Sequence, residues 1–309
     1  MSVELTLRSD QKNLLDLVVV EQQDPETTTN SFWRLSTPYP RASVGVQTGE
    51  PSNKNCMRYD VTLRIPPSLT KLHVAAHSTA HIRFGDDTNS TSPSLAAVNA
   101  TTGLVDAPQP LRTLEDLFFT LYSPFENNLL LTSTALAADR MNVEMTGGWM
   151  VGSLALRERT RILTQRGGAK AHLDVITVPS ENSNSETAEL RTVTGYGRTE
   201  LNVFNPAHRH LSSDHLSTGN GDLVLHYERS GFTGPVEVNA RALHAHNLQG
   251  TGKDVPTAAH EDMDWTTVDG AGADLDGEDE KRHMWVLDKE GGDRMKVSSR
   301  QGWVGLFFV

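Results

Sequence analysis

The sequence predicts an all-β fold: a single-stranded parallel β-solenoid, similar to a β-helix, with irregular N-terminal strands and long inserted loops. Three features predict it. A six-residue phrase recurs along the chain, alternating apolar residues follow its copies, and the copies stand at near-regular intervals. Together these features are typical of folds that stack one short coil on the next. We therefore expect one domain over residues 1–309, with N-terminal strands and loops in 1–140 and repeat coils in 141–309.

The recurring phrase is an apolar residue, any residue, a small or hydroxyl-bearing residue, two residues of any kind and a glycine. Its copies VEMTGG, ILTQRG, LRTVTG, LSTGNG and VSSRQG end at Gly148, Gly167, Gly195, Gly221 and Gly302. A further copy, Val238–Leu243, has leucine in place of the glycine. Glycine at a corner permits a backbone conformation or a close approach that a Cβ atom would block. We therefore predict that these glycines are structural corners between strands.

The residues after each glycine alternate between apolar and polar, as Trp149–Leu154 and the pair Leu201 and Val203 illustrate. Period-two alternation indicates a β-strand. Successive corners from Gly148 to Leu243 stand 19 to 28 residues apart, which is the length of one coil in a repeat fold. The longer step to Gly302 contains residues 250–282, which are rich in Gly, Asp and Glu and are predicted to form an inserted acidic loop.

Strands are predicted in four further segments before the first full repeat. Asn13–Gln22 contains a β-branched run, and Met57–Ile65 alternates cleanly before two prolines. Leu72–Phe84 follows as a strand pair. Leu111–Tyr122 is compatible with a short helix, but its alternating Leu and Phe residues favour a strand.

Composition excludes several classes of function. The net charge of -11 is opposite to that expected of a protein that binds the phosphate backbone, so nucleic acid is not an expected partner. The sequence contains no run of about 18 apolar residues, so no membrane span is predicted. The only cysteine, Cys56, permits neither an intrachain disulfide nor a cysteine-based metal site. The first residues lack an apolar signal stretch, so we expect an extracellular or surface protein if a targeting segment is missing, and otherwise a cytoplasmic one.

Two groups of histidines are candidates for metal ligands or for part of a glycan site. Three of them follow one another at intervals of four: His73, His77 and His81. Four residues of a strand span about 13 Å. Ligand bonds of about 2 Å cannot bridge that distance, so we predict no metal and no cofactor. A second set is expected to align between neighbouring strands, with a spacing suited to a weak metal or glycan site, although exposed polar residues are the simpler interpretation: His215, His226, His244 and His246.

The motifs of common enzyme classes are absent from the sequence. It contains no nucleophile elbow, no P-loop and no dinucleotide-binding glycine motif after a strand. Carboxylate pairs of the glycosidase type are set by distances in space, so they stay open. A groove that brings the following residues together would favour an enzyme: Asp174, Arg198, Glu200 and Asp222. The acidic run 274–280 fails the calcium-loop pattern, because that loop would begin at Gly272 and end at His283.

Two glycosylation sequons occur close together. Asn89 and Asn99 are each followed by the required threonine two positions later, and both lie in a polar segment, 88–108, that is predicted to be a loop. They favour an exported protein modestly, because sequons also arise by chance.

The repeat copies resemble a known family. The segments ILTQRGGAKAHL, LRTVTGYGRTEL, LSTGNGDLVLHY and SSRQGWVGLFF are similar to the repeat units of adhesin-like β-solenoid domains of unknown function. SPFENNLLL and MTGGWMVGSLAL resemble the divergent fungal branch of that family. The resemblance covers 140–309 well and 57–140 loosely. It implies the fold, and it supplies no catalytic or binding residues.

We therefore expect a non-enzymatic, adhesin-like surface or interaction module that binds a glycan or a protein. Two alternatives stay open. One is an intracellular scaffold of the same fold, which the missing signal peptide favours. The other is a polysaccharide lyase or hydrolase of the β-helix type.

Overall fold

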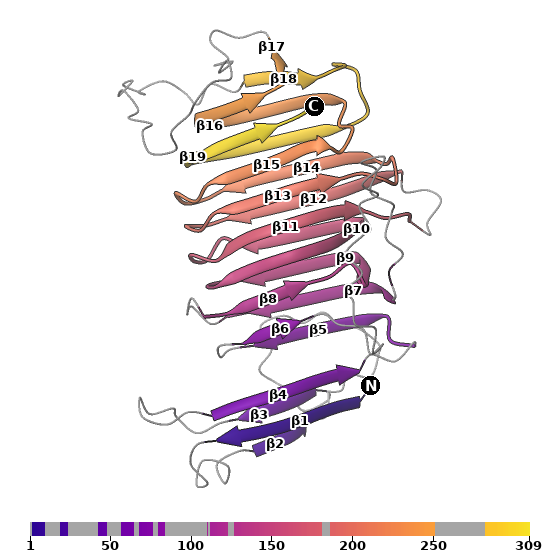
Figure 1. The fold of residues 1–309 in the computed structure, drawn as a ribbon, viewed down its shortest axis with the longest axis vertical. Coiled ribbons are helices and arrows are strands. Elements are labelled where there is room, and N and C mark those ends of the chain that lie inside the picture. The colour runs from indigo at the N-terminus through magenta and orange to yellow at the C-terminus, as the bar shows by residue number, and fades with distance from the viewer. Residues whose placement is uncertain are drawn as a thin grey trace, which may run out of the picture. The chain divides into compact units, whose positions relative to one another are not determined.

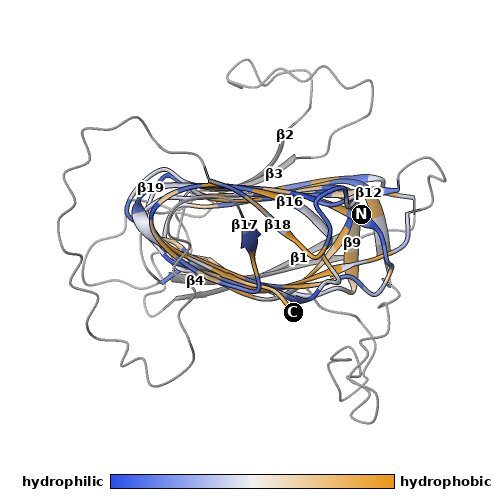
Figure 2. Cartoon of the chain, turned by 90° about the horizontal axis from the view of Figure 1, so that it is seen from above, coloured by the Kyte–Doolittle hydropathy of each residue, from blue (hydrophilic) through white to orange (hydrophobic). Residues whose placement is uncertain are grey.

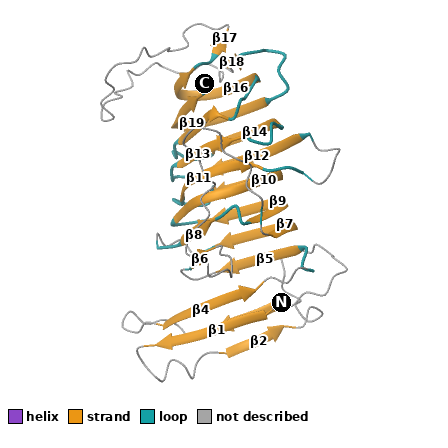
Figure 3. Ribbon diagram, turned by 45° about the vertical axis from the view of Figure 1, so that its right-hand side comes forward, coloured by secondary structure: helices purple, strands orange, loops and turns teal. Residues whose placement is uncertain are grey.

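The computed structural model describes residues 2–9, 19–23, 43–47, 57–64, 68–76, 80–83, 110, 112–122, 127–180, 186–250 and 282–309. Every element in these ranges is a strand, and none of the described residues is helical, so the all-β prediction is confirmed (Figure 3). The chain divides into two compact units, Met1–Leu69 and Thr70–Val309. The predicted loops 88–108 and 250–282 lie almost wholly outside the described residues.

The first unit contains two antiparallel strand pairs. Its strands are β1 (Ser2–Ser9), β2 (Val19–Gln23), β3 (Ser43–Gln47) and β4 (Met57–Arg64). β1 pairs with β4, and β2 pairs with β3. β4 confirms the strand predicted at 57–65. β2 overlaps the end of the strand predicted at 13–22, whose first residues lie outside the described ranges.

The second unit is a 15-stranded sheet whose strands lie side by side (Figure 1). The strands are β5 (Lys71–Ala76), β6 (His81–Arg83), β7 (Arg112–Leu121), β8 (Leu129–Thr132), β9 (Leu136–Met145), β10 (Trp149–Thr164), β11 (Lys170–Thr177), β12 (Thr187–Thr194), β13 (Thr199–Phe204), β14 (His210–Ser217), β15 (Leu223–Arg229), β16 (Gly234–His246), β17 (Gln249–Gly250), β18 (Arg282–Val286) and β19 (Arg294–Phe307). β5 and β6 confirm the strand pair predicted at 72–84, and β7 confirms the strand predicted at 111–122.

The sheet has two faces, which we name after their central strands. The β12 face contains β12, β14 and the first halves of β19 and β16. The β11 face contains β11, β13, β15 and the second halves of β19 and β16. All of these pairings are parallel, and among the described strands of this unit antiparallel pairs occur only between β16 and β18 and between β18 and β17.

The two faces close into one ring of seven parallel strands: β10, β11, β13, β15, β19, β14, β12 and back to β10. The predicted open, single-stranded parallel β-solenoid is therefore wrong, because the sheet is a closed parallel β-barrel. Figure 2 looks along the stack and shows these strands around one flattened ring.

Closure depends on two long strands that belong to both faces. The first half of β10 pairs with β11 and its second half pairs with β12. In the same way, β19 pairs with β14 through residues 294–299 and with β15 through residues 304–307. Corners between strands, as the phrase predicts, would instead end each strand at its glycine. Because β10 and β19 continue without a break, each of them hydrogen-bonds to strands of both faces. The two faces are therefore joined once through β10 and once through β19.

Side chains that alternate inward along each strand fill the space between the faces. The burial of β13 alternates strictly, and the outward positions of β12 are exposed in its first part. Leu173, Leu201, Leu225 and Leu306 stand in register on neighbouring strands, and all four are fully buried. Burial of a leucine side chain stabilises the fold by about 1.5–3 kcal/mol, so such rows account for much of the stability of this unit.

The last layers of the barrel hold an aromatic cluster and a buried carboxylate. Tyr227 contacts Phe232 and Phe308 through its ring, and all three are buried. The side chain of Asp293 accepts hydrogen bonds from the backbone N–H groups of Leu211 and Thr233, each at 2.7 Å. This carboxylate therefore joins the start of β14 to the loop before β16.

Candidate functional site

The predicted corner glycines lie where one chain segment touches the backbone of the segment beside it. A Cβ atom on Gly221 would overlap the carbonyl oxygen of Gly197, and a Cβ atom on Gly302 would overlap that of Gly221. A Cβ atom on Gly195 would lie 2.7 Å from the carbonyl oxygen of Gly167. Close approach is therefore what requires glycine at these corners.

Gly148 differs from the other four corner glycines, because its φ is +104°, a conformation that favours glycine. A Cβ atom there would also overlap the carbonyl oxygen of Asn128. Gly302 differs in another way, since it lies inside the unbroken strand β19. The five glycines form part of the framework, and the exposed side chains of the two faces lie beside them.

The copies of the phrase do not all align with one another in space. Thr164 stands in register with Thr194, and Thr194 with Ser217. Ile162 therefore pairs with Thr192 and not with Leu190, the first residue of its copy. The number of residues between a paired strand position and the following corner glycine differs from copy to copy. Equivalent positions of the phrase therefore lie in different rows of the sheet.

A fully buried hydrogen-bond chain crosses the barrel at His215. Its Nδ1 lies 2.8 Å from the Thr192 hydroxyl, and its Nε2 lies 2.9 Å from the Tyr227 hydroxyl. The Tyr227 hydroxyl donates to the Ser213 hydroxyl at 2.8 Å, so it accepts from His215. Burial lowers the pKa of His215 from 6.5 to about 3 and raises the pKa of Tyr227. This histidine was predicted to align with exposed ones, but it is a neutral core residue.

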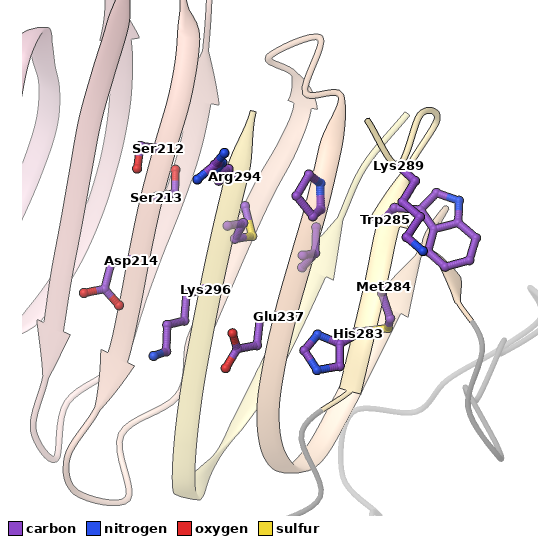
Figure 4. Close-up of a pocket in the computed structure, with 13 residues that line it drawn as sticks. Ser212, Ser213, Asp214, Glu237, His283, Met284, Trp285, Lys289, Arg294 and Lys296 are labelled. Atoms are coloured by element: carbon purple, nitrogen blue, oxygen red, sulfur yellow. The ribbon is translucent and has the colours of Figure 1, made fainter. Parts of the chain in front are cut away.

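A charged groove of about 610 Å³ crosses the end of the β12 face (Figure 4). Polar residues from β14, β16, β18 and β19 line it: Ser212, Ser213, Asp214, Glu237, His283, Arg294 and Lys296. Trp285 and Lys289 stand at one side, with the Lys289 Nζ 5.8 Å from the centre of the indole. Asp214 also forms an ion pair of 3.3 Å with Arg191.

The β11 face carries a patch of aromatic and imidazole rings at the same end of the barrel. We call it the aromatic–histidine patch: His226, His244, Trp303 and Phe307. The rings of His226 and Phe307 stack at 4.7 Å, and those of His244 and Trp303 lie nearly parallel at 6.5 Å. All four side chains are partly exposed.

Gly305 explains how the rings of the patch are placed. A Cβ atom on Gly305 would lie 2.6 Å from the Trp303 ring and 3.0 Å from the Phe307 ring. The two rings therefore lean over the glycine from either side, as aromatic side chains do when they cover a glycine in a sheet. The result is a partly apolar surface on a rigid backbone.

Polar side chains continue from the patch along the β11 face. Arg198 pairs with Glu200 at 2.9 Å, and the side-chain amide of Asn202 donates to Asp174 at 2.8 Å. Asp222 accepts the backbone N–H of Trp303 at 2.9 Å. The structure therefore brings the predicted carboxylates and Arg198 onto one face. Each of them has a partner there.

Two of the aligned histidines belong to one row. His226 and His246 both stand in register with Phe307, one on each side of it. The prediction missed Trp303 and Phe307, although a signal was present. In the closing segment they occupy the positions that alternate with the buried Val304, Leu306 and Phe308, so they point outward.

The remaining candidates are not brought together. His73 is in β5 and His81 is in β6, and these strands pair with different neighbours. His77, Asn89, Asn99 and the run 274–280 lie outside the described residues. Within those residues, no group of three or more His, Cys, Asp or Glu side chains is placed to hold a metal ion. The described part of the chain also contains no helix long and apolar enough to cross a membrane.

Comparisons with family models, with curated proteins and with solved structures find no match to this chain.

Proposed function

We propose that this chain is a non-enzymatic binding module that recognises a carbohydrate chain through the aromatic–histidine patch. The carrying observation is the pair of partly exposed rings, Trp303 and Phe307, that lean over Gly305. The C–H bonds on one face of a sugar ring form an apolar surface, which packs on an aromatic ring. The hydroxyl groups at the edge of the sugar require hydrogen-bond partners, and His226 and His244 stand beside the rings to provide them.

An extended ligand is supported by the row that leads away from Trp303. This row crosses five strands, with Asp222 and Arg198 one position before β15 and β13: Trp303, Asp222, Arg198, Lys170 and Trp149. Trp149 is 47% exposed, and the Lys170 Nζ lies 4.8 Å from the centre of its ring. Four strand spacings separate the two indoles by about 19 Å. A chain of sugar rings would meet an aromatic ring at each end and polar groups between them.

The rigidity of the face favours binding without reorganisation. The side chains project from parallel strands held by backbone hydrogen bonds on both sides. A surface that is ordered before the ligand arrives avoids much of the entropy cost of association. A rigid face favours binding of a glycan and of a protein equally. The preference for a glycan therefore depends on the aromatic rings and their polar neighbours.

A glycan array followed by calorimetry tests the proposal. We expect the purified protein to bind one class of polysaccharide, and we expect Trp303→Ala to weaken that binding about tenfold, since one ring contact contributes about 1.4 kcal/mol. Phe118→Ala is the matched control, because Phe118 of β7 is 38% exposed, contacts an imidazole and stands in the row that continues through β9 and β10 to Arg191 of the β12 face. Equal loss in both variants, or binding to proteins only, would contradict the proposal. Release of shortened sugars would instead support the enzyme alternative.

A further inference from the structure

The groove on the β12 face contains two rows of side chains with different charge. The first row crosses four strands, and its first three members alternate in charge: Asp214, Lys296, Glu237 and His283. Asp214 has a second cation, Arg191, at 3.3 Å on its other side. Lys296 therefore stands between two carboxylates, and the charges of this row balance. Figure 4 shows the row crossing the groove.

The second row lies two residues from the first, toward the start of β14, β16 and β19 and toward the end of the antiparallel β18, and contains no carboxylate. It consists of Ser212, Arg294, Pro235 and Trp285. Lys289 adds a second positive charge beside the Trp285 ring. Within the part of the chain that the structure describes, no ion pair involves Arg294 or Lys289. The groove therefore combines a balanced row with an uncompensated positive one.

We propose that this second row binds the carboxylate of a uronic acid unit in a polysaccharide. The guanidinium group of Arg294 presents a fork of N–H donors that matches a carboxylate, with the Ser212 hydroxyl next to it. The exposed Pro235 and the partly exposed Trp285 form an apolar floor on the other side of Arg294. A sugar ring lying on that floor directs its carboxylate toward Arg294.

The balanced row distinguishes a uronic acid from an acidic peptide. Asp214 and Glu237 lie about 7 Å from the second row, which is two residues along a strand. Their carboxylates accept hydrogen bonds from sugar hydroxyl groups. A peptide with consecutive acidic residues would place like charges against them, which is unfavourable. One carboxylate surrounded by hydroxyl groups is the ligand that fits both rows.

The dimensions of the groove agree with such a unit. Arg294 and Trp285 are separated by two strand spacings, about 10 Å. The groove volume of about 610 Å³ is enough for a ring that carries a carboxylate, with room for its neighbours in the chain. This site lies on the face opposite the aromatic–histidine patch, so it does not depend on that patch.

Calorimetry with an oligosaccharide that contains a single uronic acid unit, and with the methyl ester of the same oligosaccharide, tests the proposal, because the two probes differ only at that carboxyl group. We expect the acid to bind the full chain at least tenfold more tightly than the ester, and we expect added salt to reduce the difference. Arg294→Gln should weaken binding of the acid at least tenfold. Equal affinity for acid and ester, or no binding of either, would overturn the proposal.

Two control variants separate this site from general electrostatics and from the patch. Lys296→Gln removes the same charge from the same strand but in the balanced row, so it should retain nearly all binding of the acid. If Lys296→Gln and Arg294→Gln weaken binding equally, net charge explains the effect and the site is wrong. Trp303→Ala should leave acid binding by the groove unchanged, so failure of the patch and failure of the groove give different results. Unchanged thermal melting of each variant verifies that it is folded.

Discussion

At the scale of single residues, His215 shows how the barrel uses polar side chains in its interior. The imidazole is fully buried, yet both ring nitrogens have partners, and the hydrogen-bond chain continues to the Ser213 hydroxyl through Tyr227. A buried polar group with all its partners costs little, whereas one without them costs about 1–3 kcal/mol. This arrangement permits a histidine where the neighbouring strands place Thr192 and Val297.

The same residue makes stability depend on pH. The pKa of His215 is about 3 in the folded chain and near 6.5 in the unfolded chain. The unfolded state therefore binds a proton first as the pH falls below 6.5, and this loss of stability continues down to about pH 3. At pH 5 we expect a loss of about 2 kcal/mol relative to pH 7. Urea unfolding at the two pH values measures it.

His215→Gln should remove this part of the pH dependence, because glutamine keeps polar contacts and does not titrate. His226→Gln is the matched control, since His226 is on the surface with 29% of its side chain exposed. The control should retain the wild-type difference between pH 7 and pH 5. An unchanged difference in His215→Gln would show that other groups cause it.

At the scale of elements, the corners decide how closely the strands stack. Gly221 is buried, and its missing Cβ leaves room for the carbonyl oxygen of Gly197. The position of such glycines was predictable, because each ends a copy of the phrase and alternating residues follow it. The register was not, since Ile162 and Leu190 occupy the same place in the phrase but different rows of the sheet. Pairing between strands, and not the phrase, sets the row.

Gly221→Ala should lower the free energy of unfolding by about 1–3 kcal/mol, because the added methyl group forces neighbouring backbone apart. Thermal and urea unfolding measure the change. Gly168→Ala is the control: Gly168 is exposed, and a Cβ atom there meets nothing within 4 Å. It should be neutral or slightly stabilising. Equal melting temperatures of the two variants would contradict the steric explanation.

At the scale of the whole Thr70–Val309 unit, contacts that are distant in sequence hold the end of the barrel. Asp293 connects to Leu211 and Thr233, which are 82 and 60 positions away. Its carboxylate accepts both backbone N–H groups, and it lies 3.8 Å from the His210 Nδ1. Such a contact orders three segments at once.

Asp293→Asn should destabilise the fold by about 1.5–3 kcal/mol. The amide oxygen accepts one of the two backbone N–H groups, while the amide nitrogen faces the other as a second donor. Asp288→Asn provides the control, because Asp288 is exposed and accepts a single local N–H from Glu290 at 2.9 Å. Urea unfolding should separate the two variants clearly, and a loss of equal size in both would contradict the argument.

The sequence by itself determined the strands and the outward direction of their side chains. Alternation in Met57–Ile65, Leu111–Tyr122 and the closing segment depends on neighbouring residues only, because a strand has a period of two. The same period points Trp303 and Phe307 away from the core. The glycine at each corner is visible in the phrase, whereas the backbone contact that requires it comes from the neighbouring segment.

Only the tertiary structure decided the closure of the sheet and the composition of its surfaces. The sheet closes because β10 and β19 pass from one face to the other without a break, and a local pattern does not encode pairing on both faces. The patch and the groove likewise combine residues that are distant in the chain, such as His226 with Phe307 and Asp214 with Lys296. Hydrogen bonding between strands determines which residues become neighbours on a face. The loops between those strands differ in length, and the phrase does not determine that length.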